Sequence, residues 1–278
     1  MDPALSFIEV IEVGGRRLEY RYRPGAHGGR PTLVFLHEGL GSVSLWKQFP
    51  DRVADALGCG ALVYSRYGYG GSEVLEEAHR VDYMHREGLE VLPALLQALE
   101  VSAPVLIGHS DGASIALVYA GSGPDSGARR GVRSGPDPVG LVLLAPHVFV
   151  ERLSVDSIAA AKVAFETTDL PQRLARHHAD PARTFYGWND IWLHPEFRSW
   201  NIEEYLPGVR CPVLVIQGRD DEYGTMRQVE AIRAQCEGSV EVVALDRCGH
   251  SPQRDRPEAS IAAIVGFVSR TVTAGLSA

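Results

Sequence analysis

Long apolar runs are missing from this sequence. No stretch of its 278 residues approaches the about 18 consecutive apolar residues that a membrane-spanning helix needs, so we expect no membrane span. Residues 1–13 carry acidic side chains and only short apolar runs, unlike a signal peptide with its basic start and apolar centre. We therefore predict a cytoplasmic protein that does not act at a membrane.

Cysteine is scarce. The four cysteines are scattered, form no Cys-x-x-Cys pair and have no histidine at zinc-finger spacing; they are Cys59, Cys211, Cys236 and Cys248. This pattern argues against a disulfide framework or a zinc finger, and we interpret the four residues as reduced core thiols. We predict no metal site and no cofactor.

An excess of basic residues is also absent. The chain has 27 Lys and Arg against 35 Asp and Glu, a formal net charge of −8. Because nucleic-acid affinity rests on Lys and Arg that neutralise phosphates, this balance argues against a nucleic-acid partner. Nothing in the sequence indicates an oligomeric state.

The chain does have enough apolar material for one large core, since 45% of its residues are hydrophobic. A hairpin is predicted first, from β-rich runs at 7–13 and 16–23 around Gly14-Gly15, a pair that tolerates the positive φ of a tight turn. From residue 31 on, continuous apolar runs alternate with amphipathic stretches, which is typical of a mostly parallel α/β sheet flanked by helices. The expected strands are 32–36, 61–64, 105–107, 141–144, 213–216 and 240–245, and the expected helices are 45–57, 82–99, 112–119, 226–236 and 257–272.

Two segments interrupt this alternation. Residues 121–138 are rich in Gly, Ser and Pro, which predicts a long, mobile surface loop. Residues 147–206 contain helical stretches and no strand-like run, so we predict a small helical cap inserted into a core formed by 1–146 and 207–278. An aromatic cluster in this cap either packs a small subdomain or lines a pocket; it comprises Phe185, Tyr186, Trp188, Trp192, Phe197 and Trp200.

The pentapeptide Gly108-His109-Ser110-Asp111-Gly112 matches Gly-x-Ser-x-Gly between an expected strand and an expected helix. In that context the serine sits on a tight turn that lifts its hydroxyl above the sheet, and the helix N-terminus beneath it favours negative charge. We predict Ser110 as a nucleophile, the alternative being a small helix-capping residue. Centring the motif on Asp111 would lose both glycines, which argues against an aspartate nucleophile.

A serine nucleophile needs a base, and that base needs a carboxylate to orient it. His250 stands in a loop just past the last expected strand, between Gly249 and Pro252, and is the predicted base. The other histidines are interpreted as structural, with His177-His178 near Asp180 as a weak metal cluster; they include His37, His79, His85, His109, His147 and His194.

Three acids follow the strand 213–216, namely Asp220, Asp221 and Glu222. Each can reach the end of the sheet, so position alone leaves the choice of carboxylate open. The chain order serine, acid, histidine is that of the α/β-hydrolases.

From about residue 6 to residue 270, the chain resembles α/β-hydrolase fold serine hydrolases of the compact esterase and acyl-hydrolase type. The resemblance places the family's Gly-x-x-Asp on Gly218 and Asp221, which selects Asp221 over Asp220, and its Gly-His-x-Pro on Gly249, His250 and Pro252.

The family's oxyanion loop corresponds to His37-Glu38-Gly39, with Trp46 nine residues after the histidine. The resemblance implies that backbone N–H groups of Gly39 and Asp111 stabilise an oxyanion, with Glu38 as an alternative to Gly39. Glu38 replaces the usual glycine. It either points outward into solvent or contacts a water or a polar or cationic substrate group.

The segment 66–72 matches Asp-x-x-Gly-x-Gly-x-Ser of the relatives at Gly68, Gly70 and Ser72. We interpret it as a structural turn, because it lacks the spacing of a dinucleotide site. From Arg66 and Tyr67 we expect only a changed loop surface.

These residues together predict a serine hydrolase that cleaves an ester, or a thioester, of a small to medium, partly apolar or aromatic molecule. Candidate substrate contacts are Glu38, His109, Trp188 and Trp192. Lactone, amide and carbon–carbon cleavage of a dienoic diketone stay open, because the fold is shared among them. A non-hydrolytic enzyme such as a lyase, acyltransferase or perhydrolase, or a ligand-binding protein on the same fold, is the further alternative.

Overall fold

The computed structural model describes residues 7–26, 29–124 and 133–275. Its sheet runs in the order β1-β2-β4-β3-β5-β6-β7-β8, with β1, β2 and β4 paired antiparallel and the other pairs parallel. All eight predicted strands are present, which confirms the mostly parallel α/β fold class. The strands are β1 (Ile8–Val13), β2 (Arg16–Arg23), β3 (Thr32–Leu36), β4 (Gly60–Tyr64), β5 (Pro104–His109), β6 (Gly140–Leu144), β7 (Val213–Gly218) and β8 (Val240–Leu245).

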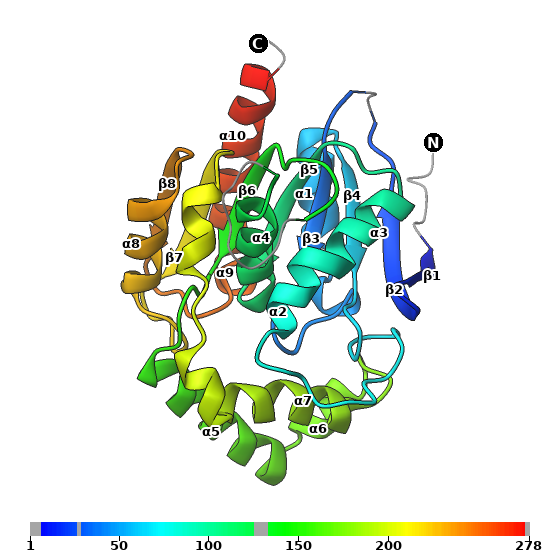
Figure 1. Cartoon of the computed structure of the whole chain (residues 1–278), viewed down its shortest axis with the longest axis vertical. Coiled ribbons are helices and arrows are strands. Elements are labelled where there is room, and N and C mark those ends of the chain that lie inside the picture. The colour runs from blue at the N-terminus through cyan, green and yellow to red at the C-terminus, as the bar shows by residue number, and fades with distance from the viewer. Residues whose placement is uncertain (1–6, 27–28, 125–132, 276–278) are drawn as a thin grey trace.

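Helices cover both faces of the sheet (Figure 1). They are α1 (Phe49–Leu57), α2 (Tyr83–Arg86), α3 (Leu92–Ala98), α4 (Asp111–Gly121), α5 (Arg152–Thr167), α6 (Leu170–Leu174), α7 (Pro181–Leu193), α8 (Met226–Gln235), α9 (Pro252–Asp255) and α10 (Pro257–Gly275), with the turns η1 (Ser44–Trp46), η2 (Glu87–Val91), η3 (Pro195–Ser199) and η4 (Glu203–Gly208). No helix of the described ranges is both long and apolar enough to span a bilayer.

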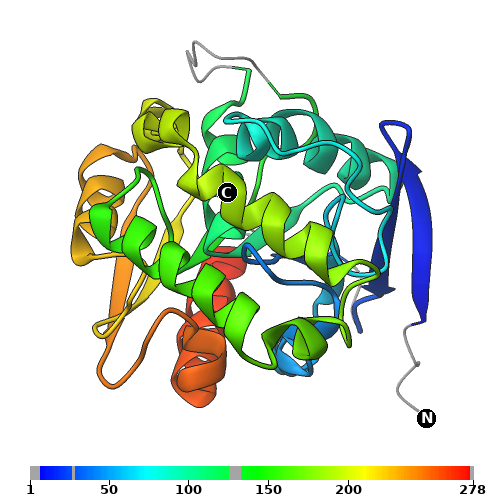
Figure 2. The ribbon, with the colours of Figure 1, turned by 90° about the horizontal axis from the view of Figure 1, so that it is seen from below.

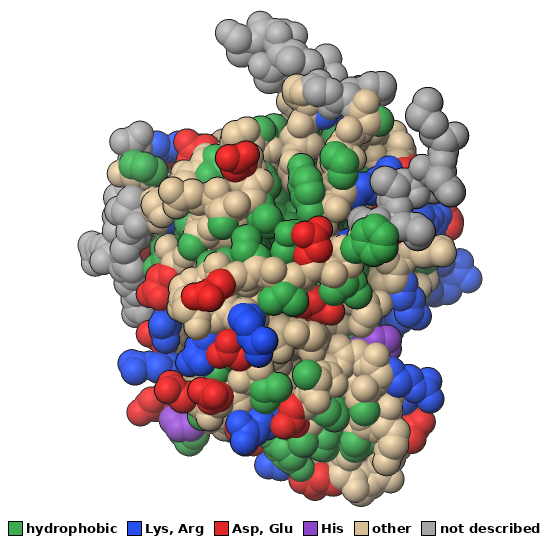
Figure 3. Space-filling view, turned by 90° about the vertical axis from the view of Figure 1, so that its right-hand side faces the viewer, with side chains coloured by type: hydrophobic (Ala, Val, Ile, Leu, Met, Phe, Trp, Pro, Cys, Tyr) green, Lys and Arg blue, Asp and Glu red, His purple; other side chains and the backbone are tan. Residues whose placement is uncertain are grey.

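The hairpin between β1 and β2 turns at Gly14 and Gly15, whose φ angles are +60° and +76°. Both angles lie in the region that L side chains avoid, so the glycine pair fixes this turn as predicted. Ion pairs hold β2 to the rest of the core, with Arg16 2.7 Å from Glu73 and Arg21 2.8 Å from Asp51. Acidic and basic side chains intermingle on the face seen in Figure 3.

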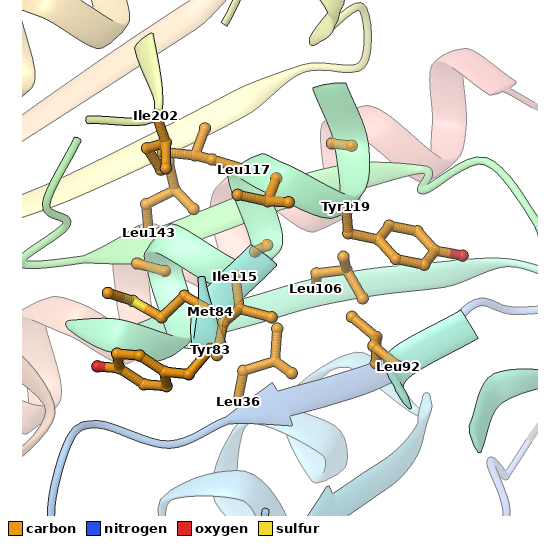
Figure 4. Close-up of a cluster of buried hydrophobic side chains, with 14 of the residues drawn as sticks. Leu36, Tyr83, Met84, Leu92, Leu106, Ile115, Leu117, Tyr119, Leu143 and Ile202 are labelled. Atoms are coloured by element: carbon orange, nitrogen blue, oxygen red, sulfur yellow. The ribbon is translucent and has the colours of Figure 1, made fainter. Parts of the chain in front are cut away.

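The parallel strands are buried on both sides because their alternate side chains enter two different clusters. In β3, Val34 and Leu36 face the cluster beneath α2, α3 and α4, whereas Leu33 and Phe35 face the cluster beneath α1 and α10. Figure 4 shows the first cluster, in which labelled side chains of α2, α3 and α4 gather around Leu36, Leu106 and Leu143 of the sheet. This packing explains the continuous apolar runs of the sequence.

Two predicted helices are interrupted. The stretch 45–57 is the turn η1 followed by α1, because Lys47 between them has a φ of 51° that a helix cannot accommodate. The stretch 82–99 is α2, the π-helical turn η2 and α3. Pro93, near the start of α3, lacks the N–H that a continuous helix would use, and its ring would collide with a carbonyl one turn earlier.

The segment between β6 and β7 is helical and lies across the carboxyl ends of the parallel strands (Figure 1). Seen from below in Figure 2, α5 and α7 run side by side over this edge. Within 147–206 the structure has no strand, only an isolated bridge between Phe149 and Asn201. These helices therefore stand where a pocket at the strand ends would open.

Parts of the segment 121–138, which was predicted as a surface loop, are buried in the structure. Gly121 is a buried residue of α4, and residues 125–132 lie outside the described ranges. Arg133 is buried, stacks on the ring of Tyr119 at 4.3 Å and donates to the carbonyl of Gly135 at 2.7 Å. The later end of this segment is thus packed against α4.

All four cysteines are free thiols. Cys59 and Cys248 are buried as predicted, whereas Cys211 and Cys236 are only half-buried. The second pair packs against the margin of the core beside β7 and α8 and is not fully buried, so the interpretation as core thiols holds only in part for it.

Candidate active site

Ser110 occupies the turn between β5 and α4 in a strained conformation, with φ 52° and ψ −116°. A Cβ at Gly108 would lie 2.3 Å from the carbonyl oxygen of Gly112, and one at Gly112 would lie 2.0 Å from that of Leu36. Both glycines of the pentapeptide are therefore required by backbone contacts, and the turn has the geometry that the motif predicts.

His250 links Ser110 to Asp221. The Nε2 atom of His250 lies 2.9 Å from Ser110 Oγ, and its Nδ1 lies 2.9 Å from each carboxylate oxygen of Asp221. Because the carboxylate accepts the Nδ1 proton, Nε2 is free to accept the serine proton. The three predicted residues thus form one continuous hydrogen-bonded chain.

Asp221 is held ionised and in place. It accepts hydrogen bonds from the amides of Tyr223 at 2.7 Å and Gly224 at 3.2 Å and from the side chain of Gln217 at 2.7 Å. Burial raises the pKa of Asp221, but the hydrogen bond and charge of His250 outweigh burial, so that its pKa is lowered overall. Asp220 is exposed, and only its backbone N–H contacts this loop, at Cys248.

The predicted oxyanion residues Gly39 and Asp111 both line the pocket of Ser110. A Cβ at Gly39 would lie 2.0 Å from Nε1 of Trp188, so the close approach of this indole requires glycine. The N–H of Asp111 is the first of α4 and has no helical carbonyl to bond. Both backbone segments are therefore tightly placed beside Ser110.

The side chain of Asp111 is 1% exposed. Its Oδ2 accepts a hydrogen bond from Tyr83 at 2.7 Å and lies 3.6 Å from Nη2 of Arg66. The Tyr83 hydroxyl in turn accepts one from Nε1 of Trp192 at 3.1 Å. The expectation of a mere loop surface at Arg66 is wrong, because this side chain is buried beneath the candidate site.

Glu38 does not point outward into solvent. Its side chain is 31% exposed, lines the pocket and places Oε2 3.3 Å from Nδ1 of His109. A Cβ at Gly41 would lie 2.5 Å from this carboxylate oxygen, so Gly41 provides the room for it. Burial raises the pKa of Glu38, but the hydrogen bond and charge of His109 lower it to about 2.

His109 also supports the loop of His250. Its Nε2 donates to the backbone carbonyl of His250 at 2.7 Å, and Gln253 lies 2.9 Å from its Nδ1. The ring therefore joins three segments of the pocket wall and is buried among them. A substrate that contacts His109 would therefore contact the same part of the pocket wall that positions His250.

The pocket above Ser110 has a volume of about 240 Å³. Ser154 and Ile158 of α5 and Trp188 and Trp192 of α7 form one side of it, so the two predicted tryptophans do line it. This volume is below the roughly 300–1,000 Å³ of drug-sized sites, which favours a small ligand.

Sequence reasoning missed several pocket residues, and two of them pack on the ring of His250. Tyr223 packs its ring 4.7 Å from that of His250, and His147 packs its ring 5.4 Å from it. Burial, together with the charge of His250, lowers the pKa of His147 to about 3. His147 follows β6 by three residues, so its position at a strand end was a usable signal; Tyr223 carries none.

The weak metal cluster at His177 and His178 is used for protein contacts. His178 accepts a hydrogen bond from the N–H of Gly70 and donates one to the carbonyl of Leu40, each at 3.0 Å, and His177 lies 2.8 Å from Ser44 Oγ. Among the described residues, no group of three or more His, Cys, Asp or Glu is arranged to hold a metal ion.

The chain is similar to known proteins over most of its length. The model of the alpha/beta hydrolase family matches residues 33–264. The chain is 23% identical over 257 residues to Esterase Rv0045c of Mycobacterium tuberculosis, covering 87% of this chain and 84% of that protein. It is 24% identical over 280 residues to the hydrolase YugF of Bacillus subtilis, covering 95% and 99%.

The fold is also that of solved structures. A proline iminopeptidase of Mycobacterium smegmatis is similar with a TM-score of 0.74 at 18% identity, over 97% of this chain and all of that one. Since the family match spans most of the sequence and includes Ser110, Asp221 and His250, the chain belongs to the alpha/beta hydrolase family and is a hydrolase.

Proposed function

We propose that this hydrolase cleaves a carboxylic ester, or a thioester, through an acyl-enzyme formed on Ser110. The observation that carries the proposal is the hydrogen-bonded chain from Ser110 Oγ through His250 to Asp221, with 2.9 Å at each step. No other serine of the described ranges has a ring nitrogen of His250 within hydrogen-bond distance.

In the first half of the reaction, Ser110 Oγ attacks the carbonyl carbon and His250 Nε2 takes the serine proton. Asp221 stabilises the imidazolium that results, and the N–H groups of Gly39 and Asp111 stabilise the oxyanion. Collapse of the tetrahedral intermediate expels the leaving group, which receives the proton from His250. Water then attacks the acyl-enzyme with His250 as base and releases the acid.

The helical segment 147–206 acts in this proposal as a cap over the site. It contributes Ile158, Trp188 and Trp192 to a pocket of about 240 Å³. Such a wall favours a small to medium acyl group with an apolar or aromatic part. The name of the similar mycobacterial esterase supports ester as the first choice of bond.

An aspartate nucleophile is disfavoured. Asp111 is the acid beside Ser110, but its carboxylate is buried and its Oδ2 is bonded by Tyr83. An ester formed on this carboxylate would remove its negative charge and leave the buried Arg66 without its charged neighbour. We therefore assign covalent chemistry to Ser110 and to no acid of this turn.

The test is a panel of p-nitrophenyl esters and acyl-CoA thioesters of graded chain length, run on wild type and on Ser110→Ala. We expect turnover of the shorter members by the wild type and none by the variant. A fluorophosphonate probe should label wild type and Ser199→Ala, an exposed serine remote from the pocket, but not Ser110→Ala. Equal activity of Ser110→Ala and wild type would refute the mechanism.

A wider assay separates the remaining alternatives. Hydrolysis of a dienoic diketone or a lactone without ester turnover would change the substrate class but keep the site. An added alcohol or peroxide that competes with water would reveal an acyltransferase or a perhydrolase. The cytoplasmic location stays a prediction from the sequence.

A further inference from the structure

Arg66 is a buried arginine to which the proposed reaction assigns no role. Its side chain is 3% exposed, and its guanidinium lies 4.7 Å from the centre of the Tyr69 ring. Burying a charged group is costly unless it is paired and hydrogen-bonded. The partners of Arg66 therefore indicate what this charge does.

The first partner is the backbone carbonyl of Glu38. It accepts from Arg66 Nη2 at 2.9 Å, from His37 Nδ1 at 2.7 Å and from the N–H of Gly41 at 3.1 Å. The Nε2 of His37 accepts the N–H of Arg66 at 3.0 Å, so the His37 proton is on Nδ1. Three donors, one of them a full positive charge, thus converge on a single carbonyl oxygen.

That carbonyl belongs to the same peptide group as the N–H of Gly39. The peptide bond is trans, and in a trans peptide the C=O and the N–H point in opposite directions. Donors gathered at the Glu38 oxygen therefore direct the Gly39 N–H to the other side, where Gly39 lines the pocket of Ser110. A charged donor on the oxygen also polarises the N–H and strengthens the bond it gives.

The second partner is the carboxylate of Asp111, 3.6 Å from the same Nη2 atom. Asp111 carries the other proposed oxyanion N–H, at the start of α4, whereas Glu38 follows β3. One guanidinium thus ties together two loops that are far apart in the chain and that both face the reacting carbonyl oxygen.

We propose that Arg66 is a positioning residue for the oxyanion site, which aligns and polarises the Glu38–Gly39 peptide and fixes the Asp111 end of α4. This inference rests on the proposed acyl-transfer function. Arg66 does not touch the substrate and acts only through Gly39 and Asp111. The alternative is a purely structural ion pair with Asp111, which would influence folding but not the oxyanion.

A second cavity gives experimental access to Arg66. It has a volume of about 310 Å³ and is lined in part by Arg66, Tyr69 and Tyr83, none of which lines the active-site pocket. Arg86 stands in the wall of the same cavity but is largely exposed and pairs with Glu90 at 3.4 Å. Arg86→Ala is therefore a matched control that removes an arginine from the cavity without touching Glu38 or Asp111.

The first test is Arg66→Lys, which keeps the buried charge but loses the Nε contact with His37 and the stacking on Tyr69 that hold Nη2 between Glu38 and Asp111. Loss of one direct oxyanion donor costs about 10²–10³ in kcat, so a positioning residue should cost about 10–100-fold. We expect this loss in kcat with KM within about threefold, and a parallel rise in the Ki of phenylboronic acid, whose adduct with serine carries the oxyanion charge. Arg86→Ala should match the wild type in kcat, in KM and in the Ki of phenylboronic acid.

The second test is Arg66→Ala with added guanidinium. We expect low millimolar guanidinium chloride to restore kcat in a saturable way, because the ion can enter the cavity left beside Tyr69. Sodium chloride at the same ionic strength should restore nothing, and Arg86→Ala should not respond. Where the variant folds only with guanidinium present, the kcat of that refolded protein is the measurement.

The inference is overturned if Arg66→Lys keeps kcat and boronate affinity within about twofold of wild type, or if kcat falls while boronate affinity does not. It is also overturned if guanidinium restores the fold of Arg66→Ala without restoring kcat. Failure of the proposed function looks different, because the wild type itself would then lack ester turnover and fluorophosphonate labelling.

Discussion

The carboxylate of Glu38 lies 3.3 Å from the imidazole of His109, and that imidazole holds the backbone carbonyl of His250 at 2.7 Å. A negative charge therefore stands in the pocket wall next to the base of the proposed reaction. The pKa of Glu38, lowered to about 2 by His109 against the effect of burial, keeps this charge present at any pH at which the enzyme is assayed.

Substitution of Glu38 should change substrate preference by charge. For Glu38→Gln we expect kcat/KM to fall about tenfold for a cationic ester such as a choline ester, since a pocket charge pair contributes about 1–2 kcal/mol. The uncharged 3,3-dimethylbutyl ester of the same acid should change by less than about threefold. An equal effect on both esters would show that Glu38 serves only to hold His109.

Asp221 and Asp220 form a matched pair for testing the acid. Asp221→Asn keeps the shape but removes the charge and favours the wrong tautomer of His250, which lowered kcat about 10⁴-fold in the serine-protease precedent. Asp220 is exposed and does not reach His250, so Asp220→Asn should stay within about twofold of wild type. If steady-state kinetics showed a larger loss of kcat for Asp220→Asn than for Asp221→Asn, Asp220 would be the acid that orients His250.

Gly39 should tolerate no side chain. A Cβ there would overlap Trp188 Nε1, at 2.0 Å, so Gly39→Ala must displace the indole or the loop, and kcat/KM should fall about 100-fold. Gly39→Ala combined with Trp188→Ala should recover part of the loss, because the clash is gone. Gly266→Ala in α10, with its nearest neighbour at 3.4 Å, is the control and should leave activity unchanged. Purely additive losses would exclude the clash as the cause.

Trp188 should set the upper size of the acyl group. Trp188→Ala removes a large aromatic surface from a pocket of about 240 Å³, so the optimum in the p-nitrophenyl ester series should move to chains about two to four carbons longer. Tyr186→Ala, in the same helix but absent from the pocket lining, should leave the profile unchanged. A uniform loss at all chain lengths would place Trp188 outside the acyl site.

The stability of the fold should fall on mild acidification. His178 accepts the N–H of Gly70 through its unprotonated nitrogen, and burial lowers its pKa below the ordinary 6.5. Burial lowers the pKa values of His37 and His147 in the same way.

The unfolded chain therefore binds protons more readily than the folded one below pH 6.5, and the free energy of unfolding decreases as the pH falls toward the folded pKa values. Each such histidine contributes up to about 1.4 kcal/mol per pH unit. In urea titrations between pH 5 and pH 7.5, His178→Gln should be less stable at neutral pH and should show a shallower pH dependence. If the free energy of unfolding of His178→Gln depended on pH as steeply as that of the wild type, His178 would not contribute to the loss of stability in acid.

Local patterns were enough to predict the strands and the turn at Ser110, because the glycines and apolar runs that define them are neighbours in the chain. Position alone left three acids open after the strand 213–216, and only the resemblance to the hydrolase family, whose Gly-x-x-Asp falls on Gly218 and Asp221, selected Asp221. The sequence predicted a single helix over 82–99 and missed the π-helical turn η2. Its apolar spacing stays helical across Pro93, although this residue lacks the N–H of a continuous helix.

Contacts between distant segments were beyond the sequence. The orientation of Glu38 depends on the space beside Gly41 and on His109, which follows a different strand. The burial of Arg66 depends on Asp111 and Tyr83, which approach it only when β4, β5 and α2 are assembled. Such relationships are set by tertiary packing and leave no spacing rule in the chain.

The hydroxyl of Tyr83 bonds both the indole of Trp192 in α7 and the carboxylate of Asp111 at the start of α4. The Tyr83 hydroxyl oxygen is therefore a shared hydrogen-bond partner of Trp192, in the helical segment over the site, and of Asp111, next to Ser110. The position of α7 is thus linked to that of Asp111 through Tyr83, which accepts from Trp192 and donates to Asp111. Substrate recognition in the cap and the backbone N–H group at the start of α4 therefore depend on the same buried hydroxyl group, although α7 and α4 are far apart in the chain.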